Sequence, residues 1–414
     1  MSARAAADSL APLQAYCHAA SFRTMRSPSG HLSHPFLVPG GAYGHQLWDW
    51  DSYWVFVGLT AVDAPDAAEY RDRLTEHAVG SWLNFFSHQA DNGAVPLLIE
   101  ADRVDLFNCR REDGSANQAK PILAQFALAI VEWSGTTAWL TKHFDGLVRF
   151  LERWWTRYRS QCGLLVWGSD VASGVDNDPT VFGRPPFSSA GVLLNALYVR
   201  ELEAAAVLAR RLGRSADAQR FDERRRHLIA AINRECWDPI DGFYYTADVL
   251  CSDQRDVHVP GDFAKGMDMS WRTLPLKVRM FTGFLPLWAG AATPEQAHEL
   301  MTRHWRSNTS FRAPFGVRSL ANLERMYAPE VQSMNPSNWL GPVWLVASYL
   351  VYAGMIRYGF VAEASELARV THRLLLRDLN RTQTLHECYH PDTGEPNFNA
   401  GFLSWNTLAL QMKA

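Results

Sequence analysis

Long stretches of the chain repeat apolar residues at the spacing of an amphipathic helix. In the segment 67–86, Leu74, Ala78, Trp82 and Phe85 recur every three to four residues and share one helical face. The same pattern predicts helices over 118–131, 138–158, 192–212, 217–233, 294–305, 342–358, 361–376 and 403–412, with weaker candidates at 12–23 and 51–62. The total approaches twelve helices, which indicates an all-α protein.

The breaks between these helices are of two kinds. Short breaks contain a glycine, as at Gly135, Gly213 and Gly359, and join neighbouring helices into pairs. Long irregular segments separate the pairs, at 31–50, 91–116, 164–188, 240–272, 307–337 and 382–400. Consecutive helical pairs predict a closed toroid of helical hairpins that forms one domain over residues 1–414. All the long loops then emerge on one rim, where we expect the functional site. Only the segment 240–250 alternates enough to predict a small β-hairpin.

Composition narrows the class of protein. The formal net charge is -3 with both signs mixed along the chain, so we expect no nucleic-acid partner. No apolar run approaches the ~18 residues of a membrane span, and residues 1–10 do not resemble a signal peptide. The six cysteines form no CxxC pair, which favours a reducing, cytoplasmic compartment without a zinc cage. The expected partner is a small molecule, and a homo-oligomer is left open.

The segment 40–54 (GGAYGHQLWDWDSYW) is the densest in candidate chemistry. Four aromatic residues and two carboxylates, including Asp51, fall between Trp48 and Trp54. Aromatic faces stack on the C–H surface of a sugar ring, and carboxylates accept its hydroxyl protons. The alternative is a buried aromatic cluster capped by aspartates.

Two further loops carry carboxylates. Residues 168–179 contain Asp176 and follow Trp167, whose ring would desolvate an acid and raise its pKa. The same loop is compatible with a calcium ligand set or with structural Asx turns. Residues 386–395 contain Glu387 between His386 and His390, which are either ordinary polar residues or a metal pair without a third ligand.

Residues 334–344 end a long loop and begin the helix predicted at 342, and they contain Trp339 and Trp344. Trp405 lies near the start of the last predicted helix. Each is a candidate wall of a sugar pocket, with core packing as the alternative. Two carboxylates with aromatic walls fit glycoside hydrolysis, in which one acid protonates the leaving oxygen. No phosphate loop, metal signature or cofactor motif competes with this interpretation, so we expect neither metal nor cofactor.

Several of these motifs resemble motifs of known glycosidases, and they occur in the same order along the chain. Residues 39–41 (PGG) and 50–53 (WDSY) resemble the trehalase signature loop. Residues 173–179 (SGVDNDP), 338–344 (NWLGPVW), 386–389 (HECY) and 393–395 (TGE) are similar to the acid, aromatic and base segments of glycoside hydrolase family 63. The resemblance covers about residues 35–410 and implies an (α/α)6 toroid that inverts the anomeric centre.

By this resemblance Asp176 is the general acid and Glu387 the general base, with carboxyls about 6.5–9.5 Å apart. Asp51 would hold sugar hydroxyls. The aromatic residues expected to shape the substrate site are Trp48, Trp50, Trp167, Trp339, Trp344 and Trp405.

Departures from the family indicate the substrate. Residues 332–336 read QSMNP where the second trehalase signature has Gln-Trp-Asp, and Leu340 replaces the usual arginine. The compact chain most resembles bacterial mannosylglycerate and glucosylglycerate hydrolases, which implies an inverting α-glycosidase acting on a small α-glucoside or α-mannoside, most of all a glycosylglycerate. The candidate partners of an aglycone carboxylate are Tyr43, Gln118, Lys120 and Arg184.

Three alternatives remain open from the sequence. The first is an α-glucosidase acting on a disaccharide such as kojibiose or trehalose. The second is a sugar epimerase or isomerase that uses His386 and His390 for proton abstraction. The third is a sugar-binding toroid without catalysis.

Overall fold

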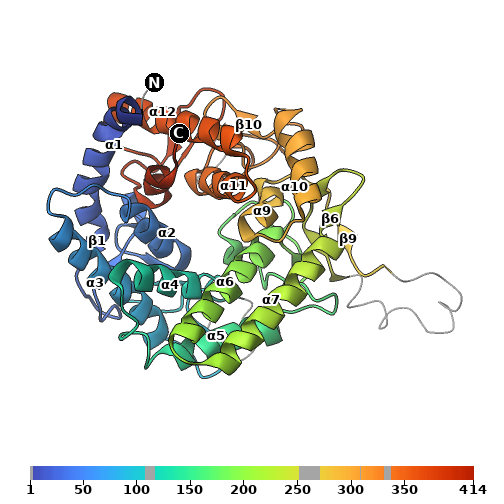
Figure 1. The fold of residues 1–414 in the computed structure, drawn as a ribbon, viewed down its shortest axis with the longest axis horizontal. Helices are drawn as coiled ribbons and strands as arrows, with labels where there is room; N and C mark the ends of the chain where they lie inside the picture. Colours follow the sequence, from blue (N-terminus) through green and yellow to red (C-terminus); the bar gives the residue numbers. More distant parts are fainter. Residues whose placement is uncertain (1–2, 108–116, 251–270, 308, 331–336) are drawn as a thin grey trace, which may run out of the picture.

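The computed structural model describes residues 3–107, 117–250, 271–307, 309–330 and 337–414. Helices make up most of it (Figure 1). The α-helices of these ranges are α1 (Ala3–Thr24), α2 (Asp49–Leu59), α3 (Ala67–Ser87), α4 (Leu123–Ser134), α5 (Phe144–Arg157), α6 (Val192–Arg211), α7 (Ser215–Glu235), α9 (Leu285–Ala289), α10 (Pro294–Met301), α11 (Leu345–Arg357) and α12 (Val361–Thr382). The shorter helices are η1 (Gly41–Tyr43), η2 (Val171–Ser173), η3 (Phe281–Phe284), η4 (Thr302–Arg306) and η5 (Ser404–Gln411).

The helices form two concentric rings. Helices α2, α4, α6, α9 and α11 and the 3-10 helix η5 contact one another in that order, and η5 returns to α2. Helices α1, α3, α5, α7, α10 and α12 lie outside them (Figure 1). Consecutive elements therefore alternate between the outer and inner rings, which confirms the predicted (α/α)6 toroid.

Burial explains which helices are inside. Nine of the eleven residues of α2 are buried, because a helix with neighbours on all sides has no solvent face. The outer helix α5 instead buries one stripe, which includes Leu147, Leu151 and Trp154, and exposes charged residues elsewhere. The inner ring thus forms the core, and the outer ring shields it.

Close contacts between distant parts of the chain close the ring. A Cβ added to Gly58 in α2 would lie 1.9 Å from Thr407 Oγ1 in η5, so only glycine allows these helices to approach so closely. Gly40 forms a β-bridge with Phe402 at the same closure. Residues 40–58 and 402–407 are therefore held side by side.

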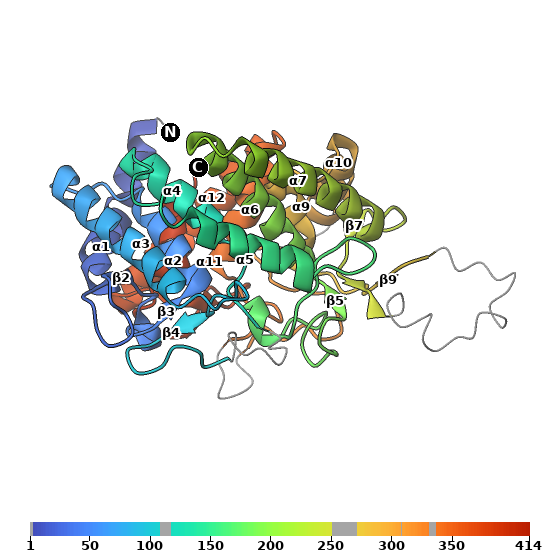
Figure 2. The ribbon, with the colours of Figure 1, turned by 90° about the horizontal axis from the view of Figure 1, so that it is seen from below.

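Short strands connect the helices at their ends. Antiparallel pairs join β1 (Met25–Arg26) to β2 (Phe36–Leu37), β3 (Leu47–Trp48) to β4 (Leu98–Ile99), β6 (Trp237–Asp238) to β7 (Phe243–Tyr244), β10 (Arg312–Ala313) to β11 (Gly316–Val317), and β12 (Cys388–Tyr389) to β13 (Pro396–Phe398). A three-stranded sheet has the order β5 (Ser189–Ala190), β8 (Ala247–Asp248), β9 (Leu274–Pro275). Figure 2 shows β3, β4 and β5 at one end of the helices, the rim expected to carry the long loops.

The expected hairpin at 240–250 is wrong in its pairing. Strand β7 pairs with β6 and strand β8 with β5 and β9, so the two strands belong to different sheets. The five-residue helix α9 was not predicted. The segment 294–305 is helical as predicted but changes after Met301 into a π-helical turn.

Among the described residues, no helix combines the length and apolarity needed to cross a membrane. Cys17, Cys236 and Cys388 are buried free thiols and Cys162 is buried as well, whereas Cys109 and Cys251 lie outside the described residues.

Candidate active site

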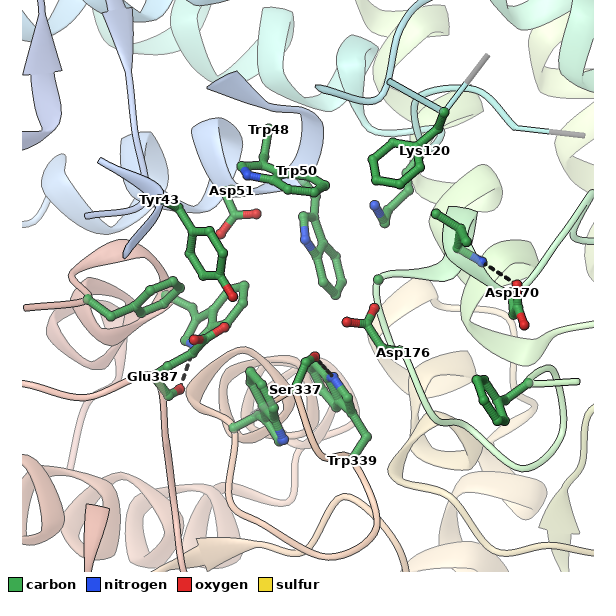
Figure 3. A pocket seen from close by; sticks show the side chains of 17 residues that line it. Tyr43, Trp48, Trp50, Asp51, Lys120, Asp170, Asp176, Ser337, Trp339 and Glu387 are labelled. Atoms are coloured by element: carbon green, nitrogen blue, oxygen red, sulfur yellow. Dashed lines mark hydrogen bonds between the residues drawn. The ribbon is translucent and has the colours of Figure 1, made fainter. Parts of the chain in front are cut away.

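The loops of one rim surround a cavity of about 370 Å³. Its aromatic wall comes from Tyr43, Trp48, Trp50, Phe107, Phe182, Trp339, Trp344, Phe402 and Trp405. Its ionisable lining consists of Asp51, Lys120, Asp170, Asp176 and Glu387. Figure 3 shows Asp176 and Glu387 on opposite sides of this cavity, with Asp51 and Trp50 along a third side.

Asp51 reaches the cavity from the first turn of α2, where an acidic residue is favoured by the helix dipole. Its Oδ1 accepts a 2.8 Å hydrogen bond from Ser404 Oγ, across the closure of the ring. Burial raises the pKa of Asp51 to about 7, and the hydrogen bond from Ser404 and the charge of Lys120 oppose that rise. Asp51 is thus a buried hydrogen-bonding group that ionises near neutral pH.

Lys120 lies just before α4 and is held by Asp49. Its ammonium Nζ is 3.0 Å from Asp49 Oδ1, and its backbone N–H donates to Asp49 Oδ2 at 2.6 Å. The same Nζ lies 4.8 Å from the centre of the Trp50 ring, in a cation–π arrangement. Both ends of this lysine are therefore fixed from α2.

Asp176 follows the short helix η2, which ends at Gly174 in the left-handed conformation (φ +71°). Burial raises the pKa of Asp176 and a nearby Asp170 adds to that rise, whereas a hydrogen bond with Ser337 and the charge of Lys120 lower it. Asp176 is thus suited to keep a proton in a partly desolvated site.

Amide hydrogen bonds join the loop that carries Asp176 (residues 168–179, the acid loop) to the loop that carries Trp339 and Trp344 (residues 337–344, the tryptophan loop). Asn177 Nδ2 donates to Asn338 Oδ1 at 3.0 Å, and Asn177 Oδ1 accepts from the backbone N–H of Trp339 at 2.7 Å. Asn338 also accepts from Trp344 Nε1 through its carbonyl at 2.9 Å. The rings of Trp339 and Trp344 stack with centroids 4.0 Å apart. The acid and two aromatic walls are thereby fixed relative to one another.

Glu387 directly precedes β12 and is only 5% exposed. Its Oε2 accepts a 2.9 Å hydrogen bond from Asn399 Nδ2, and its backbone carbonyl accepts from Trp405 Nε1 at 3.1 Å. Burial raises the pKa of Glu387 to about 8, and the negative charges of Asp51 and Asp176 contribute to this rise. These contributions place the three acids in one electrostatic unit.

The flanking histidines turn away from the cavity. His386 Nδ1 is 2.9 Å from Asp378 Oδ2, which also accepts from Tyr389. His390 lies 3.6 Å from Glu330. Neither histidine lines the cavity, and no group of three or more histidine, cysteine or acidic side chains in the described ranges is arranged to hold a metal.

The cavity brings together nine of the site residues expected from the sequence. They are Tyr43, Trp48, Trp50, Asp51, Asp176, Trp339, Trp344, Glu387 and Trp405. Lys120, a candidate partner of an aglycone carboxylate, lines it as well.

Three expected site residues lie outside the cavity lining. Arg184 forms an ion pair with Asp248 and donates a hydrogen bond to Ser189 Oγ at 3.0 Å, so its positive charge is already balanced by Asp248. Trp167 packs in the core near Trp154 and so does not act as a wall. Gln118 is fully buried, and within the described structure its amide has no hydrogen-bond partner.

Seven lining residues were missed, of which Asp170, Val171 and Gly174 belong to the loop 168–179 that carries Asp176. Ser337 directly precedes the motif 338–344, and this position was the signal that could have found it; in the structure it is hydrogen-bonded to Asp176. Phe107, Phe182 and Phe402 are single phenylalanines in loops, and nothing in their local sequence distinguishes them from core residues.

Comparison with known proteins identifies the family. The mannosylglycerate hydrolase MGH1-like glycoside hydrolase domain matches residues 43–405. The chain belongs to this glycoside hydrolase family. A mannosylglycerate hydrolase of Thermus thermophilus is 28% identical over 175 residues, which are 42% of this chain and 34% of the relative. A mannosylglycerate hydrolase of Rubrobacter radiotolerans is 26% identical over 225 residues, 54% of this chain and 43% of the relative. The aligned part thus spans less than half the length of these relatives.

Solved structures share the fold over nearly the whole chain. The GH63 mannosylglycerate hydrolase of Thermus thermophilus in complex with glucose has a TM-score of 0.70 at 22% identity, covering 96% of this chain and 99% of that one. The neutral trehalase of Saccharomyces cerevisiae has a TM-score of 0.62 at 16% identity, covering 92% and 74%. At these identities the likeness establishes the helical toroid alone.

Proposed function

We propose that this glycoside hydrolase is an inverting α-glycosidase that cleaves a glycosylglycerate, with Asp176 as general acid and Glu387 as general base. The observation that carries the proposal is the placement of these two carboxyls on opposite sides of one aromatic cavity (Figure 3). The glycerate aglycone is taken from the mannosylglycerate hydrolases to which the chain is similar.

The proposed reaction is a single displacement. Asp176 gives its proton to the glycosidic oxygen while the bond to the anomeric carbon breaks. Glu387 takes a proton from a water molecule as that water attacks the anomeric carbon from the opposite face. The products are the free aglycone and a β sugar. Asp51 accepts hydroxyl hydrogens of the sugar in the cleaved subsite, and Trp344 and Trp405 stack against its ring.

One observation favours a second substrate class for the same reaction, a neutral disaccharide such as kojibiose. Lys120 is the cation of the described cavity lining, and Asp49 already pairs with it. The lining also includes apolar Phe107, Val171 and Phe182, of which Phe182 is 59% exposed and so lies toward solvent. An uncharged aglycone would need no further cation.

A substrate panel with matched variants tests the roles of the two carboxyls and distinguishes the two substrate classes. Wild type, Asp176→Ala, Glu387→Ala and Asp145→Ala, an exposed control, are incubated with glucosylglycerate, mannosylglycerate, kojibiose and trehalose. We expect glycosylglycerate hydrolysis by wild type and the control, and losses of about 10²-fold or more in the other two. A wild type that cleaves only kojibiose supports the second class. Near-normal turnover by either cavity variant contradicts the role of that residue, and an α sugar as first product by NMR contradicts inversion.

A further inference from the structure

Lys120 is a charged group inside the cavity that the two-carboxylate reaction does not use. Its side chain is only 2% exposed, so the ammonium has been removed from water at a considerable cost in solvation. The ion pair with Asp49 offsets that cost, but an apolar residue in a well-packed core would avoid it. The charge therefore calls for a role within the site.

The acid loop rests directly on this lysine. A Cβ added to Gly174 would lie 2.8 Å from Lys120 Cε and 2.8 Å from Trp50 Cζ2, so the bare glycine backbone touches both side chains. Gly174 stands two residues before Asp176. Figure 3 shows the amino group of Lys120 directed toward the cavity between Trp50 and the acid loop. Asp49, Lys120 and Gly174 thus form a continuous support from α2 to the acid.

We propose that Lys120 is a positioning residue for the general acid: clamped by Asp49, it supports the acid loop at Gly174 and stabilises the carboxylate that Asp176 becomes when it gives up its proton. This inference rests on the proposed function of Asp176.

The charges around the acid explain why such a residue is useful. Asp170 raises the pKa of Asp176, Ser337 is hydrogen-bonded to Asp176, and Glu387 and Tyr43 lie across the cavity from it (Figure 3). Burial and the charge of Asp170 favour the protonated form of Asp176, and they oppose release of its proton. A fixed positive charge favours the developing carboxylate in the transition state without having to move at that moment. The ammonium also lowers the pKa of Asp176, in agreement with this role.

Lys120→Met tests the inference, because methionine keeps a similar chain length and removes the charge. The double variant Asp49→Asn/Lys120→Met provides the same test without a buried unpaired carboxylate. Lys142→Met, the same change at an exposed position, is the control. Each protein is assayed from pH 5 to 10 with the best α-glycoside of the panel and with the α-glycosyl fluoride of the same sugar, whose fluoride leaves with little help from an acid.

Loss of the ammonium is expected to raise the pKa of Asp176 and to move the alkaline limb of kcat/KM upward by about one pH unit. Turnover of the glycoside should fall about tenfold or more and that of the fluoride less than about threefold, in both variants. The control should match wild type. An unmoved alkaline limb, or equal losses on both substrates, overturns the role of Lys120 while leaving the proposed function intact. A wild type that hydrolyses neither substrate overturns both.

Discussion

Replacing Glu387 by glutamine is expected to abolish catalysis and yet to stabilise the folded protein at neutral pH. Glu387 is almost fully buried and shares the cavity with Asp51 and Asp176, and its pKa is raised from 4.5 to about 8. The folded state therefore holds the proton more tightly than the unfolded chain does. Glutamine keeps the size of the side chain and an oxygen to accept from Asn399, but it removes the cost of ionisation.

The size of the effect follows from the pKa difference. An acid whose pKa is raised by folding destabilises the protein progressively as pH rises from its unfolded to its folded pKa, by about 1.4 kcal/mol per unit. At pH 7, about 2.5 units above the unfolded value, this amounts to an upper value of about 3 kcal/mol. With an unfolding entropy of about 0.9 kcal/mol/K for 414 residues, Tm should rise by up to about 3 °C.

Calorimetric unfolding of wild type and Glu387→Gln between pH 5 and 8.5 measures this gain. The difference in Tm should be small at pH 5 and should widen toward pH 8. Glu395→Gln is the matched control, because Glu395 is bonded to Arg377 and Arg381 and its pKa is lowered, so its loss should bring no gain. A Glu387→Gln protein that is no more stable than wild type at any pH, or whose advantage shrinks as pH rises, would refute the reasoning.

Two further predictions concern the acids and their supports. Asp51→Asn removes a negative charge near Glu387, so the pKa of Glu387 should fall. The acidic limb of the pH profile of kcat/KM should then move to lower pH. An unmoved limb would contradict the electrostatic coupling between Asp51 and Glu387. Asn338→Ala removes the hydrogen bond to Asn177 and should lower kcat about tenfold or more with a smaller change in KM, because it displaces Asp176 rather than the sugar subsite. Steady-state kinetics on a folded variant check this. An unchanged kcat argues against a role of this contact.

The sequence predicts the architecture well because the toroid depends on long amphipathic helices. Helix α3 begins at Ala67 as its periodicity predicts, and α6 begins at Val192. The short helix α9 escapes prediction because five residues span little more than one turn and show no period. The strand pairing at 240–250 was predicted wrongly for a different reason. Strand β8 pairs with β5 and β9, which lie elsewhere in the chain, and the local alternation of residues does not encode such tertiary contacts.

The candidate site is predictable where several residues of one motif share a task. Asp176 and Glu387 stand in such motifs, and both reach the cavity. Arg184 was selected for its charge in a rim loop, but the sequence does not reveal that Asp248, distant along the chain, pairs with it. Trp167 looks like a wall residue and packs inward instead. The sequence gives the type of each side chain, but it does not show whether that side chain points into the cavity or into the core.

The seam between α2 and η5 has a consequence for biosynthesis. Ser404 donates a hydrogen bond to Asp51, and Trp405 donates one to the backbone of Glu387, so early and late parts of the chain meet at two acidic residues of the cavity. A ribosome-bound nascent chain that lacks residues 402–411 already contains Asp51 and Glu387. It still lacks the Ser404 hydroxyl that donates to the Asp51 carboxyl and the Trp405 indole that donates to the Glu387 backbone carbonyl. We therefore expect enzymatic activity only after η5 has docked onto α2, so the appearance of activity during refolding would time that docking event.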